Sequence, residues 1–173
     1  IKLPEEISAS LGAASLLQGM TAHYLTRSTY QLKPGDLCLI HAGAGGMGLL
    51  LIQMAKALGA TVITTVSSAT KAALAENAGA DVIINYFAHD FETETKNATH
   101  GKGVQVVYDA VGETTFRKSL ACLAPLGMLV SYGQASGPVP DVNIASLSAR
   151  SLFLTRPTLA NYTASRRDLL WRA

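Results

Sequence analysis

Apolar residues along the chain recur in two patterns, short continuous runs and longer stretches at helical spacing. Six runs have the length of strands buried on both faces: 37–40, 61–66, 81–84, 104–109, 127–132 and 151–155. Periodic stretches that predict helices cover about 46–58, 69–78, 91–99 and 114–123, with a leading helix from Leu11 to Leu25. Strands that alternate with helices predict a doubly wound α/β fold with a six-stranded parallel sheet in the order 3-2-1-4-5-6.

Composition and charge narrow the class of protein. The chain has 173 residues, of which 49% are hydrophobic and 15% charged, and its formal net charge is +2. These values predict one soluble domain, with no membrane span and no field strong enough to imply nucleic acid. Cys38 and Cys122 lie far apart in apolar contexts without metal-ligand spacing. We expect both to be buried thiols in a cytoplasmic protein, with a disulfide or metal role as the alternative.

A glycine-rich turn follows the first predicted strand. Gly43, Gly45 and Gly48 match the pattern G-x-G-x-x-G between the strand 37–40 and the helix 46–58. Glycines at a strand-to-helix turn let a pyrophosphate approach the backbone, and the first-turn N–H groups then point at the anion. This context predicts a dinucleotide site in a Rossmann-type sheet.

The end of the second strand predicts which dinucleotide binds. A site for NAD usually places Asp or Glu here to accept hydrogen bonds from the ribose 2′-hydroxyl. This chain instead has Ser67, Ser68 and Lys71. Hydroxyls and an ammonium suit a 2′-phosphate, so the sequence favours NADPH. Alternatively, the serines cap the next helix and Lys71 lies in solvent on its first turn.

Several blocks in order resemble the medium-chain dehydrogenase/reductase superfamily, specifically the zeta-crystallin-like NADPH:quinone oxidoreductases. The blocks are 41–48, 53–60, 78–81, 84–86, 107–112, 132–137 and 155–157. The resemblance implies that Gly45, Gly46, Met47 and Gly48 hold the pyrophosphate. It places Ser67, Ser68, Lys71 and Tyr86 around the 2′-phosphate, and Thr21, Tyr132, Gly133, Gln134 and Thr158 near the nicotinamide.

Some of these positions have a structural alternative. Met47 stands where many members carry Val, and its side chain is expected to pack while its backbone binds. Alternatively, Tyr86 covers the edge of the sheet and its hydroxyl is solvated. His41 is expected to be a satisfied packing residue rather than a base. Asp109 has no evident His or Ser partner and is expected to cap a turn, while Ala110 replaces a polar residue of some relatives.

The pattern also predicts how the chain is organised. Residues 169–173 continue a helical pattern without a stop signal, so we expect a piece of a longer polypeptide. Residues 1–30 would link from an absent catalytic domain, 31–160 would form the dinucleotide-binding domain, and 161–173 would begin a truncated helix. The apolar sixth strand, 151–155, together with the segment 139–142, predicts a homodimer through its edge. Alternatively, carboxyl-terminal residues of the longer polypeptide cover this edge.

The resemblance implies a zinc-independent oxidoreductase that transfers hydride from NADPH to a quinone or an α,β-unsaturated carbonyl. Catalytic side chains are not expected in this chain, because the cofactor supplies the chemistry and the opposing domain is missing. Two other functions stay open. One is a non-catalytic NADPH-binding protein, crystallin-like or RNA-associated, and the other is a zinc-dependent alcohol dehydrogenase.

Overall fold

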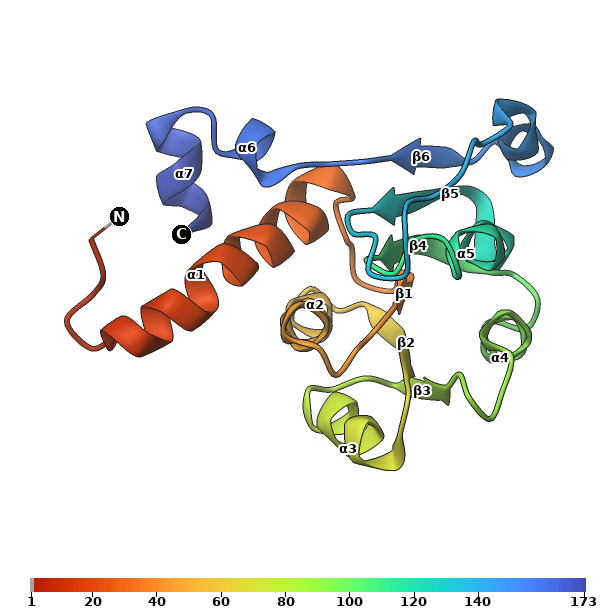
Figure 1. Cartoon of the computed structure of the whole chain (residues 1–173), viewed down its shortest axis with the longest axis horizontal. Coiled ribbons are helices and arrows are strands. Elements are labelled where there is room, and N and C mark those ends of the chain that lie inside the picture. Colours follow the sequence, from red (N-terminus) through yellow and green to blue (C-terminus); the bar gives the residue numbers. More distant parts are fainter. Residues whose placement is uncertain (1) are drawn as a thin grey trace.

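A six-stranded parallel sheet forms the centre of the computed structural model, which describes residues 2–173 (Figure 1). Its order β3-β2-β1-β4-β5-β6 confirms the predicted topology. The strands are β1 Leu37–Ile40, β2 Thr61–Val66, β3 Val82–Asn85, β4 Val104–Asp109, β5 Leu123–Ser131 and β6 Phe153–Thr155. The carboxyl ends of parallel strands meet at one edge, which is where ligands of such sheets bind.

Helices cover both faces of the sheet (Figure 1). The α-helices are α1 Ala9–Tyr24, α2 Gly46–Ala57, α3 Ala69–Asn77, α4 Phe91–Ala98, α5 Phe116–Cys122, α6 Leu159–Tyr162 and α7 Arg166–Arg172. A π-helical segment, Leu25–Thr29, continues α1, and a 3₁₀ helix covers Ile144–Arg150.

Alternate residues of the central strands pack in two separate hydrophobic cores, one on each face of the sheet. In β1, Cys38 and Ile40 pack with α1, α2 and α3, whereas Leu39 packs with α4 and α5. All three side chains are fully buried, which explains why this run has no polar positions. The sheet therefore holds the strand ends rigidly between two packed layers.

The fifth strand begins four residues earlier than predicted. Leu126 has a φ of +62°, and the register of β5 against β4 shifts at this point. Pro125 and Gly127 read as a break in the sequence, but the strand continues through it as a bulge. Consequently α5 ends at Cys122. β6 has three residues and is also shorter than predicted.

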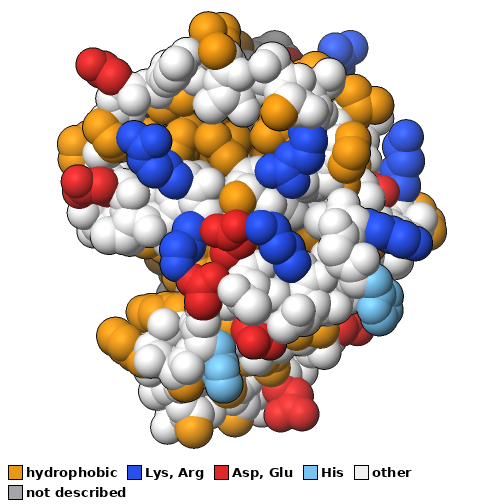
Figure 2. All heavy atoms as spheres, turned by 90° about the vertical axis from the view of Figure 1, so that its right-hand side faces the viewer, with side chains coloured by type: hydrophobic (Ala, Val, Ile, Leu, Met, Phe, Trp, Pro, Cys, Tyr) orange, Lys and Arg blue, Asp and Glu red, His pale blue; other side chains and the backbone are white. Residues whose placement is uncertain are grey.

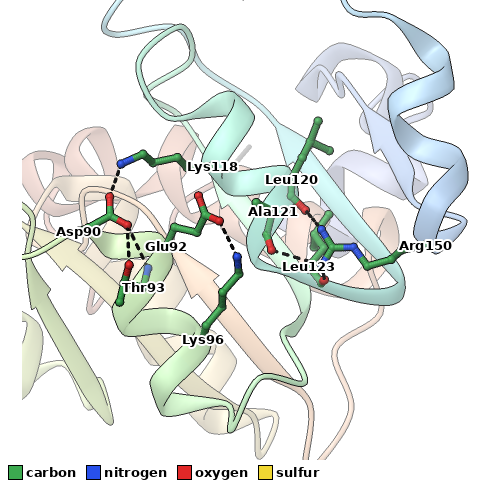
Figure 3. Close-up of polar contacts among 9 residues, drawn as sticks. All are labelled: Asp90, Glu92, Thr93, Lys96, Lys118, Leu120, Ala121, Leu123 and Arg150. Carbon is green, nitrogen blue, oxygen red and sulfur yellow. Dashed lines mark hydrogen bonds and ion pairs between the residues drawn. The ribbon is translucent and has the colours of Figure 1, made fainter.

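The 3₁₀ helix Ile144–Arg150 was not predicted, because none of its residues is buried and it has no apolar period. Arg150 holds it in place (Figure 3). Its guanidinium donates hydrogen bonds to the carbonyl oxygens of Leu120, Ala121 and Leu123, at 3.1, 3.3 and 2.6 Å. A cation at the end of α5 also suits the negative end of the helix dipole.

The expected division at residues 30 and 160 remains a prediction, and Ile1 lies outside the described residues. The leading helix α1 packs against α2, and Ala22 and Tyr24 belong to the core. The C-terminal stretch forms two helices rather than one. Ser165 caps the second of them by accepting the N–H of Asp168 at 3.0 Å.

Candidate functional site

The glycine turn lies between β1 and α2. Ala42 has a φ of +56°, in the left-handed region, and its carbonyl oxygen accepts the N–H of Gly45 at 2.9 Å. A Cβ on Gly43 would lie 2.0 Å from Thr64 Oγ1, and one on Gly48 would lie 2.3 Å from the Ala42 oxygen. The turn is therefore closed tightly enough that only glycine fits at positions 43 and 48.

The N-terminus of α2 is open toward this turn. Its N-cap is Gly45, with no side-chain cap and no acidic residue in the first turn, all of it within the described chain. The N–H groups of Gly46, Met47 and Gly48 have no partner inside the helix. The Met47 side chain packs against the core, as expected. Free donors and the positive end of the helix dipole together form a site for an anion.

A cleft of about 680 Å³ extends from the turn along the strand ends. Four of the predicted cofactor residues line it: Gly45, Ser67, Lys71 and Tyr86. The other lining residues are His41, Ala42, Ala44, Thr65, Val66, His89, Asp90, Phe91, Val111, Thr114, Thr115, Lys118, Ala135 and Ser136. The cleft thus joins the glycine turn to the end of the second strand, as the NADPH hypothesis requires.

The two serines at the end of β2 differ in their contacts. Ser68 is the N-cap of α3, and its hydroxyl oxygen accepts the N–H of Lys71 at 3.3 Å. Ser67 Oγ instead lies 3.0 Å from Lys71 Nζ, and both side chains line the cleft. The capping alternative therefore describes Ser68, while Ser67 and Lys71 present a hydroxyl and an ammonium to the cleft.

Tyr86 follows the edge strand β3 and is 46% exposed. Its ring packs against Phe87, with the centroids 4.9 Å apart. Tyr86 lines the cleft, as Lys71 does. Its exposure is compatible with a contact to the adenosine part of the cofactor and also with a solvated hydroxyl at the edge of the sheet.

The residues expected at the nicotinamide form a separate group. Although all of them lie in the described part of the chain, none lines the cleft: Thr21, Tyr132, Gly133, Gln134 and Thr158. Arg156 holds this segment, because its guanidinium donates to the Gly133 oxygen at 2.6 Å and to Gln134 Oε1 at 3.3 Å. Thr158 is exposed, at the N-terminus of α6.

The leading helix reaches the other side of the glycine turn. A Cβ on Gly46 would lie 2.6 Å from Gln18 Oε1, so the Gln18 amide lies over the start of α2. Thr21, one turn later in α1, donates its hydroxyl to the Leu17 oxygen at 2.8 Å. Sequence reasoning missed Gln18 and Arg156 as positioning residues, because both act through contacts between distant segments.

His41 and Asp109 are buried at the base of the cleft. His41 Nδ1 lies 3.1 Å from Thr65 Oγ1, and Nε2 lies 2.9 Å from Ser119 Oγ. Its ring meets Phe91 edge to face at 4.8 Å, which confirms a satisfied packing residue. Burial lowers the pKa of His41, against the opposing charge of Asp109.

Asp109 caps the turn after β4, as predicted, through the N–H groups of Val111 and Gly112 at 2.8 and 3.0 Å. The expectation that it lacks a serine partner was wrong. Ser119 donates its hydroxyl to Asp109 at 2.9 Å. Ser119 lies ten residues away on α5, where no local motif connects it to the strand end.

Among residues 2–173, no group of three or more His, Cys, Asp or Glu side chains could hold a metal ion. Cys38 and Cys122 are free thiols inside the core, and burial raises the pKa of each to about 12. Within the same residues, no helix combines the length and the apolar character that crossing a membrane requires.

The sequence profile of a family described as zinc-binding dehydrogenase matches residues 46–169, from the start of α2 to α7. The chain belongs to this family.

Curated relatives confirm the resemblance to quinone oxidoreductases. A quinone oxidoreductase of Salmonella typhimurium is 49% identical over 168 residues, which are 96% of this chain and 51% of that protein. A 2-haloacrylate reductase of a Burkholderia species is 46% identical over an alignment of 173 positions, gaps included, which covers 98% of this chain and 52% of that protein. The chain spans about half the length of the curated relatives it matches.

A solved structure shows the same fold. Quinone oxidoreductase of Escherichia coli, complexed with NADPH, matches with a TM-score of 0.96 and 47% sequence identity, over 99% of this chain and 53% of that chain. The six-stranded doubly wound sheet is therefore the fold of a known oxidoreductase half.

Proposed function

We propose that this chain is the cofactor-binding half of an NADPH-dependent oxidoreductase that reduces a quinone or an α,β-unsaturated carbonyl. The observation that carries the proposal is one cleft that joins the open N-terminus of α2 to the Ser67–Lys71 pair. The activities for which the relatives are named, quinone oxidoreductase and 2-haloacrylate reductase, support both substrate classes.

The residues present fit the cofactor. The pyrophosphate would lie on the N–H groups of Gly46, Met47 and Gly48, where a Cβ at position 48 would collide with backbone. The 2′-phosphate would lie at Ser67 and Lys71, because these side chains supply a hydroxyl donor and a positive charge. Ser68 belongs to this group through its cap, which fixes the first turn of α3 and hence the backbone of Lys71.

The nicotinamide end would lie on the far side of the glycine turn. Tyr132, Gly133 and Gln134 follow β5, and Arg156 ties their backbone to the start of the C-terminal segment. Together with Thr21 and Thr158, they would present one face of the ring to a substrate. The bound cofactor supplies the hydride, while this chain binds it, orients it and shields one side of it from water.

The opposing face needs a domain that this chain does not include. We propose that residues 1–30 connect to that domain, that 31–160 bind the cofactor, and that 161–173 begin a further helical segment. Exposed apolar side chains on α1 and α7 support this division, since Leu17 and Trp171 are 64% and 57% exposed.

The matches to quinone oxidoreductases favour a zinc-independent enzyme over a zinc-dependent alcohol dehydrogenase. The RNA-associated alternative finds little support on the face that carries α4 and α5. Figure 2 shows basic and acidic side chains interleaved there, and Figure 3 shows two of the pairs, Lys118 with Asp90 and Lys96 with Glu92. A nucleic-acid surface needs a continuous basic stripe.

A homodimer through the β6 edge completes the proposal. Among residues 2–173, β6 pairs with β5, and no other strand pairs with its second edge. Phe153 is 54% exposed and Leu154 38%, while Ile144 in the neighbouring 3₁₀ helix is 80% exposed. An apolar open edge favours pairing with a second copy across a twofold axis. The buried free thiols suit a reducing, cytoplasmic location.

Turnover of NADPH with a small quinone tests the proposed activity. The longer protein that contains this chain should oxidise NADPH steadily when the quinone is added, and its activity should persist after chelation of metals. The 173-residue chain alone should bind NADPH but give less than about 1% of that rate, because water reaches the uncovered nicotinamide face. A fragment that turns over at the full rate, or a longer protein that does not react, would overturn the proposal.

A further inference from the structure

A buried line of side-chain hydrogen bonds connects β4 to the glycine turn. It runs from Asp109 through Ser119 and His41 to Thr65, with heavy-atom distances of 2.9, 2.9 and 3.1 Å. It ends on the backbone, because the Ala42 N–H donates to Thr65 Oγ1 at 3.2 Å. The four side chains come from β4, α5, the end of β1 and β2, and each is at most 2% exposed.

The donors and acceptors along this line have one consistent direction. Asp109 accepts hydrogen bonds from two N–H groups and from the hydroxyls of Thr115 and Ser119, as an ionised carboxylate does. Ser119 therefore donates to Asp109 and accepts from His41 Nε2–H. The neutral ring then has its lone pair on Nδ1, which accepts the Thr65 hydroxyl, and Thr65 Oγ1 is left to accept the Ala42 N–H.

The backbone held by this line is strained. Ala42 has a positive φ, which is unfavourable for a residue other than glycine. Its carbonyl oxygen accepts the Gly45 N–H and lies against Gly48, so its position sets where α2 begins. Thr65 reinforces the same turn through its own carbonyl oxygen, which accepts the Gly43 N–H at 3.0 Å.

We propose that His41 is a positioning residue for the cofactor, which holds the glycine turn in its anion-binding conformation by orienting the Thr65 hydroxyl toward Ala42. This inference rests on the proposed function. His41 acts through the backbone of the turn, as a neutral Nε2–H tautomer rather than as an acid or a base. Burial of the ring, which disfavours its charged form, supports this state.

Substitutions along the line test the proposal in the 173-residue chain. His41→Leu and Thr65→Val should each weaken NADPH binding about tenfold, because the Ala42 N–H loses its oriented acceptor. His41→Asn should keep the affinity within about twofold, since an amide oxygen near the position of Nδ1 can still accept the Thr65 hydroxyl. Thr95→Val is the matched control, because Thr95 is equally buried but lies in α4 outside the cleft lining.

A second probe separates positioning from general loss of structure. Adenosine 2′-phosphate would contact the Ser67–Lys71 side without reaching the turn, so its affinity should change less than twofold in all four variants. The positioning role is contradicted if a variant loses affinity for NADPH and for adenosine 2′-phosphate by the same factor. It is also contradicted if His41→Asn binds NADPH as weakly as His41→Leu does.

The tautomer provides a test that does not depend on function. Nitrogen-15 spectra of histidine-labelled protein should show His41 with Nε2 protonated and Nδ1 unprotonated near neutral pH. A protonated Nδ1, or a rapid mixture of both forms, would overturn the assigned direction. If wild-type protein gives the predicted tautomer but does not bind NADPH, the proposed function fails while the hydrogen-bond line stands.

Discussion

Lys71 Nζ lies 3.0 Å from Ser67 Oγ at the mouth of the cleft, one turn into α3. The two side chains stand where a carboxylate would accept a ribose 2′-hydroxyl, and they present charge and a donor instead. The adjacent Ser68 caps the helix and does not line the cleft. In the proposed function the neighbouring serines therefore have separable roles: Ser67 contacts the 2′-phosphate together with Lys71, and Ser68 stabilises the helix.

Lys71→Ala should therefore reduce the preference for NADPH over NADH by tenfold or more, because a charge-assisted hydrogen bond contributes about 1.5–3 kcal/mol. Ser67→Ala should reduce it by a smaller factor. Ser68→Ala, which removes the helix cap but keeps the Ser67–Lys71 pair, should lower the free energy of unfolding by about 1 kcal/mol and change the preference much less than Lys71→Ala does. Fluorescence titration with both cofactors measures the ratio. An unchanged ratio in Lys71→Ala would contradict the assignment of this pair.

The tight glycine turn predicts a strong asymmetry between two glycine-to-alanine substitutions. Gly48→Ala places a Cβ 2.3 Å from the Ala42 carbonyl oxygen, so the turn must open and NADPH binding should fall at least tenfold. Gly19→Ala is the control, because its Cβ meets nothing within 4 Å inside α1. It should leave binding unchanged and stabilise the helix by up to about 1 kcal/mol. Calorimetric titration with thermal unfolding checks both, and equal effects would refute the steric account.

The buried histidine predicts how stability depends on pH. Burial lowers the pKa of His41 below its ordinary value of 6.5, so the unfolded state binds more protons below that pH. Stability should be highest above pH 6.5 and fall as pH drops through and below it, by at most about 1.4 kcal/mol per pH unit for this group. Urea unfolding at several pH values measures the slope. His41→Asn should flatten it, and an identical slope in this variant would exclude His41 as a source.

The open β6 edge predicts a change in assembly. Phe153→Lys places a charge on the exposed edge and should convert the proposed dimer to monomers, because a desolvated ammonium in the interface is costly. Sedimentation at tens of micromolar protein tests this. Leu74→Lys is the control, since Leu74 is 46% exposed on α3, away from that edge. A wild-type chain that sediments as a monomer at this concentration would contradict the proposed dimer.

Most of the fold could be predicted because its signals are local. Six apolar runs and the helices between them gave the strand order, and β2 and β4 have the predicted bounds. The sequence-based predictions were wrong where contacts between distant segments determine the local structure. The bulge at Leu126 lets β5 pass through Pro125, and the 3₁₀ helix at 144–150 depends on Arg150 reaching three carbonyl oxygens of another segment.

Some residues of the candidate site could likewise be predicted from local patterns, and others could not. Gly45 and the end of β2 carry a local pattern, so their place in the cleft could be predicted from spacing. Ser119 and Arg156 could not, because Ser119 meets His41 across 78 residues of sequence and Arg156 meets Gly133 across 23. Hydrogen bonds between distant segments leave no period or motif that a single sequence reveals.

The central claim is that this chain binds NADPH through the glycine turn and the Ser67–Lys71 pair. Equilibrium titration of the wild-type chain with NADPH and with NADH, at matched moderate salt, tests it most directly. We predict that NADPH binds at least tenfold more tightly, as a 2′-phosphate held by an ammonium and a hydroxyl requires. Equal affinities for the two cofactors, or no binding of either, would contradict the account.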